Sequence, residues 1–183
     1  MVEKLTAEIN SIVSLREIVV TEEVRRSFIQ RLSEGQLTRD ENPETHFCVY
    51  FAAFDPKTDR VFIGHHKKSG FWLFNGGHID EGETTRVTLR REIGEEWGEG
   101  IKMQEDSLAR PELLTITQID NPKVKCKTHY DIWYFVWVNE ATFNPEKGKL
   151  DKEFYETRWV TLDEARKLVI DPATLIAINY LEK

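Results

Sequence analysis

Three glutamates in the middle of the chain have the type and the spacing of a metal-binding set. Glu92, Glu95 and Glu96 lie in the stretch GHIDEGETTRVTLRREIGEEWG, which covers residues 77–98. On an α-helix over residues 84–97, positions i, i+3 and i+4 share one face, so the three carboxylates would stand together. Like charges at this spacing destabilise a helix by roughly a few tenths of a kcal/mol per pair. A bound cation would offset the repulsion, and oxygen ligands without nearby sulfur or imidazole favour Mg²⁺, Mn²⁺ or Ca²⁺ over zinc.

The same stretch, called the acidic motif below, resembles the signature of the Nudix hydrolases. That signature runs Gly, five residues, Glu, seven residues, Arg-Glu, an aliphatic residue, any residue, Glu-Glu, any residue, Gly and a final aliphatic residue. The chain meets every fixed position except the last, where Glu99 replaces the aliphatic residue and Ile101 is expected to supply the missing packing. Chance agreement at so many spaced positions is far rarer than for a short glycine motif.

The resemblance implies hydrolysis of a diphosphate linkage, in which water attacks one phosphorus and the other phosphate leaves. A carboxylate takes the proton from water in such a reaction. The predicted catalytic residues are Glu83, Arg91, Glu92 and Glu95, with Glu92 the first choice for general base. Arg91 and Glu83 match a family pair in which the arginine orients the acidic cluster, a task that suits the fork geometry of a guanidinium group.

The cofactor implied by the resemblance is Mg²⁺, with Mn²⁺ as an alternative. A Glu-rich stretch alone is usually a solvated helix face, but the glycines and Arg91 in register favour metal binding. Glycine also lets the main chain come close to a metal, so the carbonyl of Gly76 in the Gly76-Gly77 loop is an expected ligand. A fourth carboxylate is expected near the last strand, from Glu156 in preference to Glu153. The predicted metal ligands are Gly76, Glu92, Glu95, Glu96 and Glu156.

Basic and aromatic residues around the two glycines are candidates for binding substrate. Adjacent strand residues point to opposite faces, so only one of His65 and His66 can face a given pocket. An aromatic residue in a sheet is more often part of the core than a stacking platform, and His129 has the alternative of pairing with Asp131 at a strand end. The predicted substrate-binding residues are His66, Lys68, Trp72, Phe74, His78 and His129.

Composition narrows the class of protein. The chain has 183 residues, of which 40% are hydrophobic and 31% charged, and a chain of this length buries about 70% of its unfolded surface. A formal charge of −7 argues against broad nucleic-acid binding, which needs a basic surface, so RNA is not a favoured partner. Cys48 and Cys126 form no metal or disulfide framework, which favours a reduced cytoplasmic location. No apolar run is long enough to cross a bilayer, and the charged residues near the start do not suit a signal peptide.

Hydrophobic periodicity and turn residues predict the elements that must position these residues. The segment 3–34 is predicted as two helices with a break near residues 19–21, where Thr21 is a plausible N-cap. The strand over residues 129–138 is apolar on both faces beyond its start and should be central. In the acidic helix, Leu89, Ile93 and Trp97 form an apolar stripe that should pack on the sheet. The predicted strands are 46–54, 61–66, 113–119, 129–138 and 156–160, and the predicted later helices are 84–97, 162–169 and 171–180.

Strands and helices mixed in this order indicate an α/β fold, with a sheet covered by helices on both faces. This agrees with the α/β/α sandwich with a mixed sheet that the Nudix resemblance implies. The resemblance covers roughly residues 46–170, so we expect a Nudix domain over residues 45–183 after an N-terminal helical segment, residues 1–44. That segment is compatible with a lid, a dimer element in a homodimer, or simple packing, and packing is the default interpretation.

The function that follows is a Mg²⁺-dependent pyrophosphohydrolase acting on a small phosphorylated substrate, a nucleotide or a nucleotide derivative. Two alternatives remain open. The first is a nucleotide-binding or sensor module that kept the fold and lost turnover. The second is an isomerase of isoprenoid diphosphates in the same fold, for which Cys48 is the one strand candidate for a proton donor, although a small buried hydrophobe is the simpler interpretation of that residue.

Overall fold

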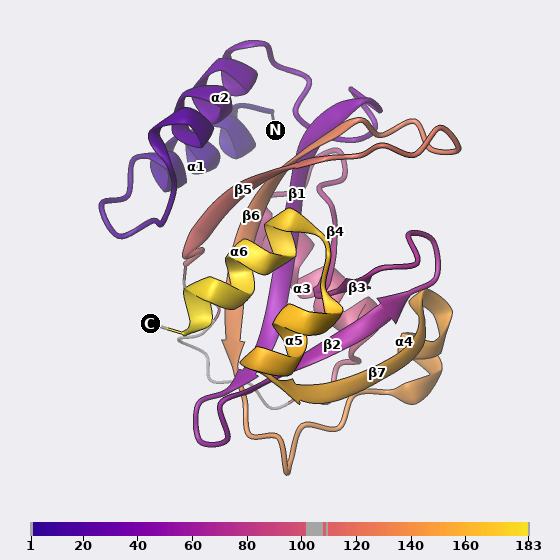
Figure 1. Ribbon diagram of the computed structural model, residues 1–183. Helices are drawn as coiled ribbons and strands as arrows, with labels where there is room; N and C mark the ends of the chain where they lie inside the picture. The colour runs from indigo at the N-terminus through magenta and orange to yellow at the C-terminus, as the bar shows by residue number, and fades with distance from the viewer. Residues whose placement is uncertain (1, 102–107, 109, 183) are drawn as a thin grey trace.

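A mixed β-sheet with helices on both of its faces organises the chain in the computed structural model (Figure 1). The structure describes residues 2–101, 108 and 110–182. Within them, the strands are β1 (Thr45–Asp55), β2 (Arg60–His66), β3 (Trp72–Leu73), β4 (Asn75–His78), β5 (Leu113–Gln118), β6 (Thr128–Trp137) and β7 (Phe154–Thr161). The helices are α1 (Val2–Val13), α2 (Glu22–Ser33), α3 (Thr85–Glu96), α4 (Lys147–Glu153), α5 (Leu162–Leu168) and α6 (Pro172–Leu181). None of the helices in these described segments is both long and apolar enough to cross a membrane.

The sheet is built around β1. Its main order is β3-β2-β1-β6-β5, with β4 added to β1 and β7 added to β2. β1 and β6 run parallel, and the other pairs are antiparallel. The prediction that the strand in residues 129–138 is central is confirmed, because β6 lies between β1 and β5 and its residues 131–136 are buried.

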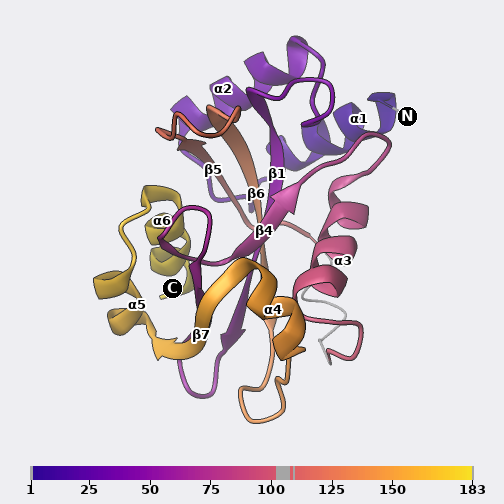
Figure 2. The same cartoon turned by 90° about the vertical axis from the view of Figure 1, so that its right-hand side faces the viewer.

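Alternate residues of β1 enter two different hydrophobic clusters. Phe47, Val49 and Phe51 join the cluster under α1, α2 and α3, whereas Ala52 and Phe54 join the cluster under α5 and α6. Figure 2 shows α3 and the α5–α6 pair on opposite sides of the strands. The predicted sandwich with a mixed sheet is therefore confirmed.

The acidic helix is held by the apolar stripe that the sequence predicts. Leu89, Ile93 and Trp97 are 1%, 4% and 0% exposed and belong to the first cluster. Thr84 caps the start of α3, where its side chain accepts a hydrogen bond from the Val87 N–H. Ile101 packs against the same cluster, as expected for the residue that replaces the missing aliphatic position.

The N-terminal helices pack on this face too. Leu5, Ile9 and Phe28 are buried in the same hydrophobic cluster as Leu89, Ile93 and Trp97 of the acidic helix. The predicted cap at Thr21 is confirmed, since its side chain accepts from the Val24 N–H. The first helix and the second thus share a core with the rest of the chain, and a domain boundary at residue 44 stays a prediction.

Three segments differ from the sequence-based prediction. The two-residue strand β3 was not predicted. Residues 75–78 form β4 rather than a loop, and Gly76 and Gly77 pair there with Tyr50 and Val49 of β1. Glycine is rare in strands, so composition pointed to a loop. A side chain at Gly76 would place its Cβ 2.7 Å from the Val49 carbonyl oxygen, which explains why glycine is needed at this pairing. The short helix α4 was not predicted, because its sequence, KGKLDKE, has one apolar residue and no periodic pattern.

Candidate active site

The acidic motif opens onto a cavity of about 690 Å³. The elements α3, β4 and α4, which supply much of its wall, lie close together in Figure 2. The cavity brings together most of the residues that the sequence singles out, but Glu83, Trp72 and Glu156 are not among its lining residues. The predicted residues that line it are His66, Lys68, Phe74, Gly76, His78, Arg91, Glu92, Glu95, Glu96 and His129.

Arg91 is the centre of the hydrogen-bond network at this wall. Its Nε and Nη2 donate to the two carboxylate oxygens of Glu83 at 2.8 and 2.9 Å, and Nη1 donates to Glu92 at 2.7 Å. Nη2 also donates to the His78 carbonyl at 3.0 Å, which ties α3 to the end of β4. The hydrogen bonds from Arg91 hold the pKa of Glu83 below its usual value, helped by a hydrogen bond from Thr88. These are the contacts that a positioning arginine requires.

Two carboxylates of the motif are buried against the cavity. Glu92 and Glu96 are each 8% exposed, whereas the side chain of Glu95 is 59% exposed. Burial raises the pKa of Glu92, although Arg91 opposes the shift, and burial raises the pKa of Glu96 to about 8. Gly77 lies against Glu92, because a Cβ there would stand 1.8 Å from Glu92 Oε1.

This donor set fits a hard divalent cation. The three carboxylates and the neighbouring Gly76 carbonyl offer only oxygen, which Mg²⁺ prefers. Buried carboxylates with raised pKa values also gain from a cation that compensates their charge. In the structure the carboxylates point to different partners: Glu96 accepts from the Asn75 side chain, and Glu92 and Glu95 face Arg91 Nη1. A cation would therefore compete with Arg91 for oxygens of Glu92 and Glu95.

The structure places Glu153, rather than Glu156, at the cavity. Glu153 ends α4, where its carboxylate accepts from Lys68 Nζ at 3.0 Å and lies 3.6 Å from His66 Nε2. Glu156 is exposed on β7 opposite His65, on the other side of the strand pair. Glu156 as the fourth carboxylate stays a prediction, but its side chain points away from the cavity. The register of β2 and β7 shifts between His65 and His66, so Phe154 pairs with His66, which lines the cavity, whereas Glu156 pairs with His65, which does not.

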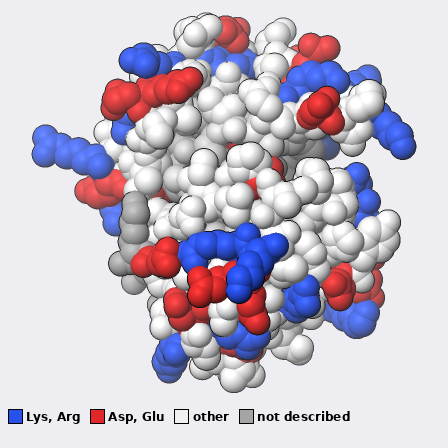
Figure 3. Space-filling model, viewed as in Figure 1, with Lys and Arg blue, Asp and Glu red and all other residues white. Residues whose placement is uncertain are grey.

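Basic side chains form another part of the cavity lining, called the basic wall below, and sequence reasoning missed most of them. Lys149 and Lys152 of α4 and Arg39 line the cavity together with Lys68. Lys149 Nζ donates to the Gly94 carbonyl of α3 at 2.5 Å, which joins α4 to the acidic helix. The repeated lysines of KGKLDK ahead of a strand were the available signal. On the face shown in Figure 3, Lys and Arg side chains are interspersed with Asp and Glu side chains rather than gathered in a basic field.

The aromatic residues divide between the cavity and the opposite face. Phe74 is buried and lines the cavity, as does Tyr50, which the sequence did not single out and which stacks on Trp133 at 4.8 Å. Trp72 instead lies outside it, stacked on His65 at 5.4 Å with the Arg158 guanidinium 4.4 Å from its ring. Trp72 pairs with His65, which does not line the cavity, whereas the next residue, Leu73, does line it.

The histidines separate in the same way. His66 lines the cavity whereas His65 does not, so the prediction that one of the two adjacent histidines faces the pocket is confirmed. His129 is 8% exposed and its Nδ1 lies 3.5 Å from the Tyr50 hydroxyl. Asp131 does not hydrogen-bond to it but accepts from Thr115 and Thr117, and burial raises the pKa of Asp131 to about 8.

Cys48 is the strand cysteine that the isomerase alternative requires. It is 1% exposed, lines the cavity, and burial raises the pKa of its thiol well above the usual value. These properties fit a small buried side chain at the cavity wall. They leave the isomerase alternative to experiment.

Comparison with known proteins places this site in context. The family model described as NUDIX domain matches residues 44–178. Among curated proteins, the nucleoside triphosphatase NudI of Enterobacter sp. (strain 638) is 31% identical over 113 residues, which cover 60% of this chain and 75% of that protein. The nucleoside triphosphatase NudI of Escherichia coli O139:H28 is 29% identical over 107 residues, which cover 57% of this chain and 72% of that protein.

Solved structures share the fold at lower identity. The E. coli dihydroneopterin triphosphate pyrophosphohydrolase superposes with a TM-score of 0.52 at 17% identity, over 73% of this chain and 92% of that chain. A NUDIX family hydrolase from Clostridium perfringens superposes with a TM-score of 0.54 at 20% identity, over 75% of this chain and 96% of that chain. A C. elegans Ap4A hydrolase superposes with a TM-score of 0.56 at 15% identity, over 74% of this chain and 94% of that chain.

Proposed function

Because this chain belongs to the NUDIX domain family and is a Nudix hydrolase, we propose that it is a Mg²⁺-dependent pyrophosphohydrolase of nucleotides or nucleotide derivatives. One observation carries the proposal: Arg91 holds the acidic motif at a cavity that basic side chains also line. An acidic wall suits a cation and a basic wall suits phosphate, so the cavity offers both partners of a metal-bound diphosphate.

The residues that would hold the cation are the carboxylates of Glu92, Glu95 and Glu96, the carbonyl of Gly76 and, from its position, Glu153. When bound, the cation supplies charge neutralisation at the phosphate oxygens and a more acidic water. The exposed carboxylate of Glu95 has the freedom to turn toward the ion, whereas Glu96 is already fixed by Asn75.

The remaining chemistry belongs to the side chains. Glu92 accepts the proton of the attacking water, since it lines the cavity and burial raises its pKa toward the range of a useful base. Arg91 and Glu83 fix the direction of that carboxylate. Lys149 and Lys152 bind the phosphate oxygens that gain charge when the linkage breaks.

The proposed substrate class rests on the relatives together with the shape of the cavity. The NudI relatives are nucleoside triphosphatases, so nucleoside triphosphates are the first compounds to test. A volume of about 690 Å³ accommodates a compound of nucleotide size. Tyr50 and Phe74 offer aromatic surface for a base beside the metal-binding wall. The expectations that RNA is not a favoured substrate and that the protein is cytoplasmic stay predictions.

The test is turnover with a matched set of charge-removing variants. Nucleoside triphosphates, dinucleoside polyphosphates and nucleotide sugars are incubated with Mg²⁺ or Mn²⁺, and products are identified by mass. We expect Glu92→Gln and Glu96→Gln to abolish product formation and to keep the wild-type circular dichroism spectrum. Glu99→Gln is the control, because this exposed glutamate adjoins the motif without lining the cavity.

Full activity in both Glu92→Gln and Glu96→Gln would refute the proposed mechanism. Tight nucleotide binding in Mg²⁺ by calorimetry, with no product over hours, would instead favour the binding or sensor module. Conversion of an isoprenoid diphosphate that is lost in Cys48→Ala would favour the isomerase.

A further inference from the structure

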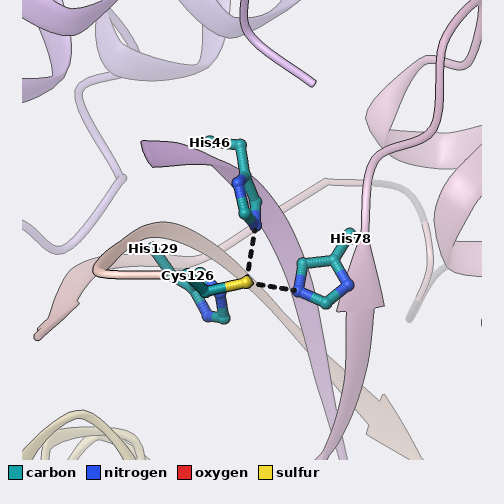
Figure 4. A group of neighbouring side chains, drawn as sticks. All are labelled: His46, His78, Cys126 and His129. Carbon is teal, nitrogen blue, oxygen red and sulfur yellow. Dashed lines mark hydrogen bonds between the residues drawn. The ribbon is translucent and has the colours of Figure 1, made fainter. Parts of the chain in front are cut away.

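Three histidines and a cysteine gather beside the cavity, away from the acidic helix (Figure 4). The sulfur of Cys126 lies 3.8 Å from His46 Nε2 and 3.9 Å from His78 Nε2. His129 completes the group, and one candidate ligand atom from each of the four residues lies within 4.8 Å of all the others. His46 and His129 are buried, and His78 and Cys126 are partly exposed.

Strand register produces this group. β1 and β6 run parallel with His46 opposite His129, so their rings lie side by side on one face of the sheet, 4.9 Å apart. His78 pairs with Cys48, two residues further along β1, and therefore meets the same face. Cys126 lies three residues before His129, at the base of the β5–β6 hairpin. A hydrogen bond from the Lys127 N–H to the Glu44 carbonyl at 2.8 Å fastens that base to the start of β1.

The spacing is close to that of a tetrahedral zinc site. In a tetrahedral site, Zn–N bonds of about 2.0–2.1 Å and Zn–S bonds of about 2.3 Å place the nitrogen atoms roughly 3.3–3.4 Å from one another and roughly 3.5–3.6 Å from the sulfur. The two distances from Cys126 Sγ, 3.8 and 3.9 Å, exceed that sulfur–nitrogen separation by about 0.3 Å, so the side chains would draw in slightly around an ion. One thiolate with three imidazoles is a zinc-type donor set, which contrasts with the oxygen donors of the acidic motif.

Two of the rings are already prepared for ligation. His46 Nδ1 lies 2.9 Å from the Asn42 carbonyl, and donation to that oxygen leaves the Nε2 lone pair free toward Cys126. His129 Nε2 is buried and, among the described residues, has no hydrogen-bond partner. An orphaned buried nitrogen is costly, and a metal bond would satisfy it. Burial lowers the pKa of both rings, which keeps them in the neutral form that binds metal.

The third ring needs one rearrangement. Arg39 Nη1 lies 3.3 Å from His78 Nδ1, and a donor there leaves the proton on Nε2, the nitrogen that faces Cys126. Ligation through Nε2 requires the other tautomer, so the contact with Arg39 must open. Arg39 is exposed and keeps a carboxylate partner, Asp80, at 3.2 Å.

We propose that His46, His78, Cys126 and His129 bind one zinc ion, at a site separate from the cation site of the acidic motif. The ion joins β1, β4 and the base of the β5–β6 hairpin, and it fixes the wall of the cavity that His78 and His129 line. This assigns those two histidines to metal rather than to substrate. The proposal departs from the expectation that the two cysteines form no metal framework, since Cys126 reaches the histidines through tertiary register rather than through sequence spacing.

Metal content tests the proposal without reference to catalysis. Full-length protein is stripped with a chelator under reducing conditions, incubated with ZnCl₂, desalted and measured by mass spectrometry of the metal. We expect about one zinc per chain at this type of site. Cys126→Ser and His129→Ala should lose at least about 100-fold in zinc affinity, more than the roughly 10- to 100-fold cost of losing an outer partner. Circular dichroism checks that each variant folds.

Cobalt distinguishes this site from the glutamates and from a second group. Co²⁺ should give a thiolate charge-transfer band that disappears in Cys126→Ser and persists in Glu92→Gln. Cys48→Ala and His65→Ala are the controls and should retain zinc. Cys48 matters because it forms the other compact group, with His129 and Asp131. Loss of zinc in Cys48→Ala with retention in Cys126→Ser would overturn the assignment, as would wild-type protein that takes up no more zinc than Cys126→Ser.

Discussion

The pair formed by Arg91 and Glu83 provides the sharpest test of how the acidic motif is held. We consider Arg91→Lys and Glu83→Gln, singly and together. The two N–H···O bonds at 2.8 and 2.9 Å form a fork in which the Arg91 side chain is 26% exposed and that of Glu83 is 16% exposed. Lysine keeps the charge but cannot make two parallel hydrogen bonds, so Arg91→Lys removes the geometry and Glu83→Gln removes the charge.

The expected magnitude follows from this partial burial. Coupling energies of exposed ion pairs are about 0.2–1 kcal/mol, and breaking a fully buried pair costs about 3–5 kcal/mol. A bidentate pair with the exposures of Arg91 and Glu83 should lie between them, so we expect a coupling free energy of about 1–3 kcal/mol in a double-mutant cycle. At roughly 2–4 °C per kcal/mol for a chain of this size, the single variants should melt several degrees below wild type.

The pH dependence has a definite sign. Arg91 lowers the pKa of Glu83 in the folded state below the value of an unfolded glutamate. A carboxylate of this kind contributes its stability above the unfolded pKa, about 4.3, and loses it as the pH falls through the folded pKa. The difference in unfolding free energy between wild type and Glu83→Gln should therefore be full at neutral pH and shrink as the pH falls below about 4.

Urea denaturation at pH 7 and at a series of lower pH values measures both quantities. The control cycle uses Lys147 and Asp151, a 2.6 Å pair on α4 with side chains 86% and 52% exposed, for which we expect less than about 1 kcal/mol. Turnover should also fall roughly 10- to 100-fold in Arg91→Lys, as for outer-shell partners of metal ligands. A coupling no larger than that of the control pair, with unchanged turnover, would refute the positioning role of Arg91.

Three further predictions follow from the same cavity. Gly77→Ala should abolish turnover in an activity assay, since its Cβ would stand 1.8 Å from a carboxylate oxygen of Glu92. Gly94→Ala places no atom within 4 Å of the new Cβ, so it should raise the unfolding free energy measured by urea titration by up to about 1 kcal/mol. Lys149→Ala should lower kcat/KM by about 10- to 100-fold, as for a lost hydrogen bond between charged groups. Lys147→Ala, at the exposed first residue of α4, is the control. Glu153→Gln should raise the Mg²⁺ concentration needed for half-maximal activity several-fold, whereas Glu156→Gln should leave it within about twofold; the reverse order would contradict the placement of the fourth carboxylate.

Local pattern predicted the parts of the site that lie close together in the sequence. The second half of the acidic motif forms one helix with its cap, so Leu89, Ile93 and Trp97 could be assigned to the core from periodicity alone. The pairing of Arg91 with Glu83 was also accessible, because both residues belong to one motif. The long strands followed from their apolar runs, and β6 was recognised as central because it is apolar on both faces.

Residues joined by long-range pairing could not be predicted in this way. Which face of a strand meets the cavity depends on register, and this decides against Trp72 and Glu156 and in favour of Tyr50. The lysines of α4 belong to a short helix that has no periodic signal, so Lys149 could not be distinguished from a solvated lysine. Cys126 contacts His46 only because β1 and β6 are parallel neighbours. The two residues are 80 positions apart in the sequence, and no sequence pattern indicates the contact.

The two walls of the cavity are held by contacts of unequal strength, and this inequality suggests how substrate would enter. On the basic wall, Lys68 is 74% exposed and bonds to Glu153, a contact worth about 1 kcal/mol or less. A phosphate would take Lys68 from Glu153 at little cost, and the Glu153 carboxylate would then be available to a cation. On the acidic wall, a cation would compete with Arg91 for Glu92 and Glu95, whereas the hydrogen bonds from Arg91 to Glu83 involve neither of those two carboxylates. The exposed contacts would therefore exchange while the Arg91–Glu83 pair preserves the position of the motif. For this reason loss of that pair should lower stability more than loss of the exposed Lys68–Glu153 pair, whereas loss of Glu92 or Glu96 should affect turnover most.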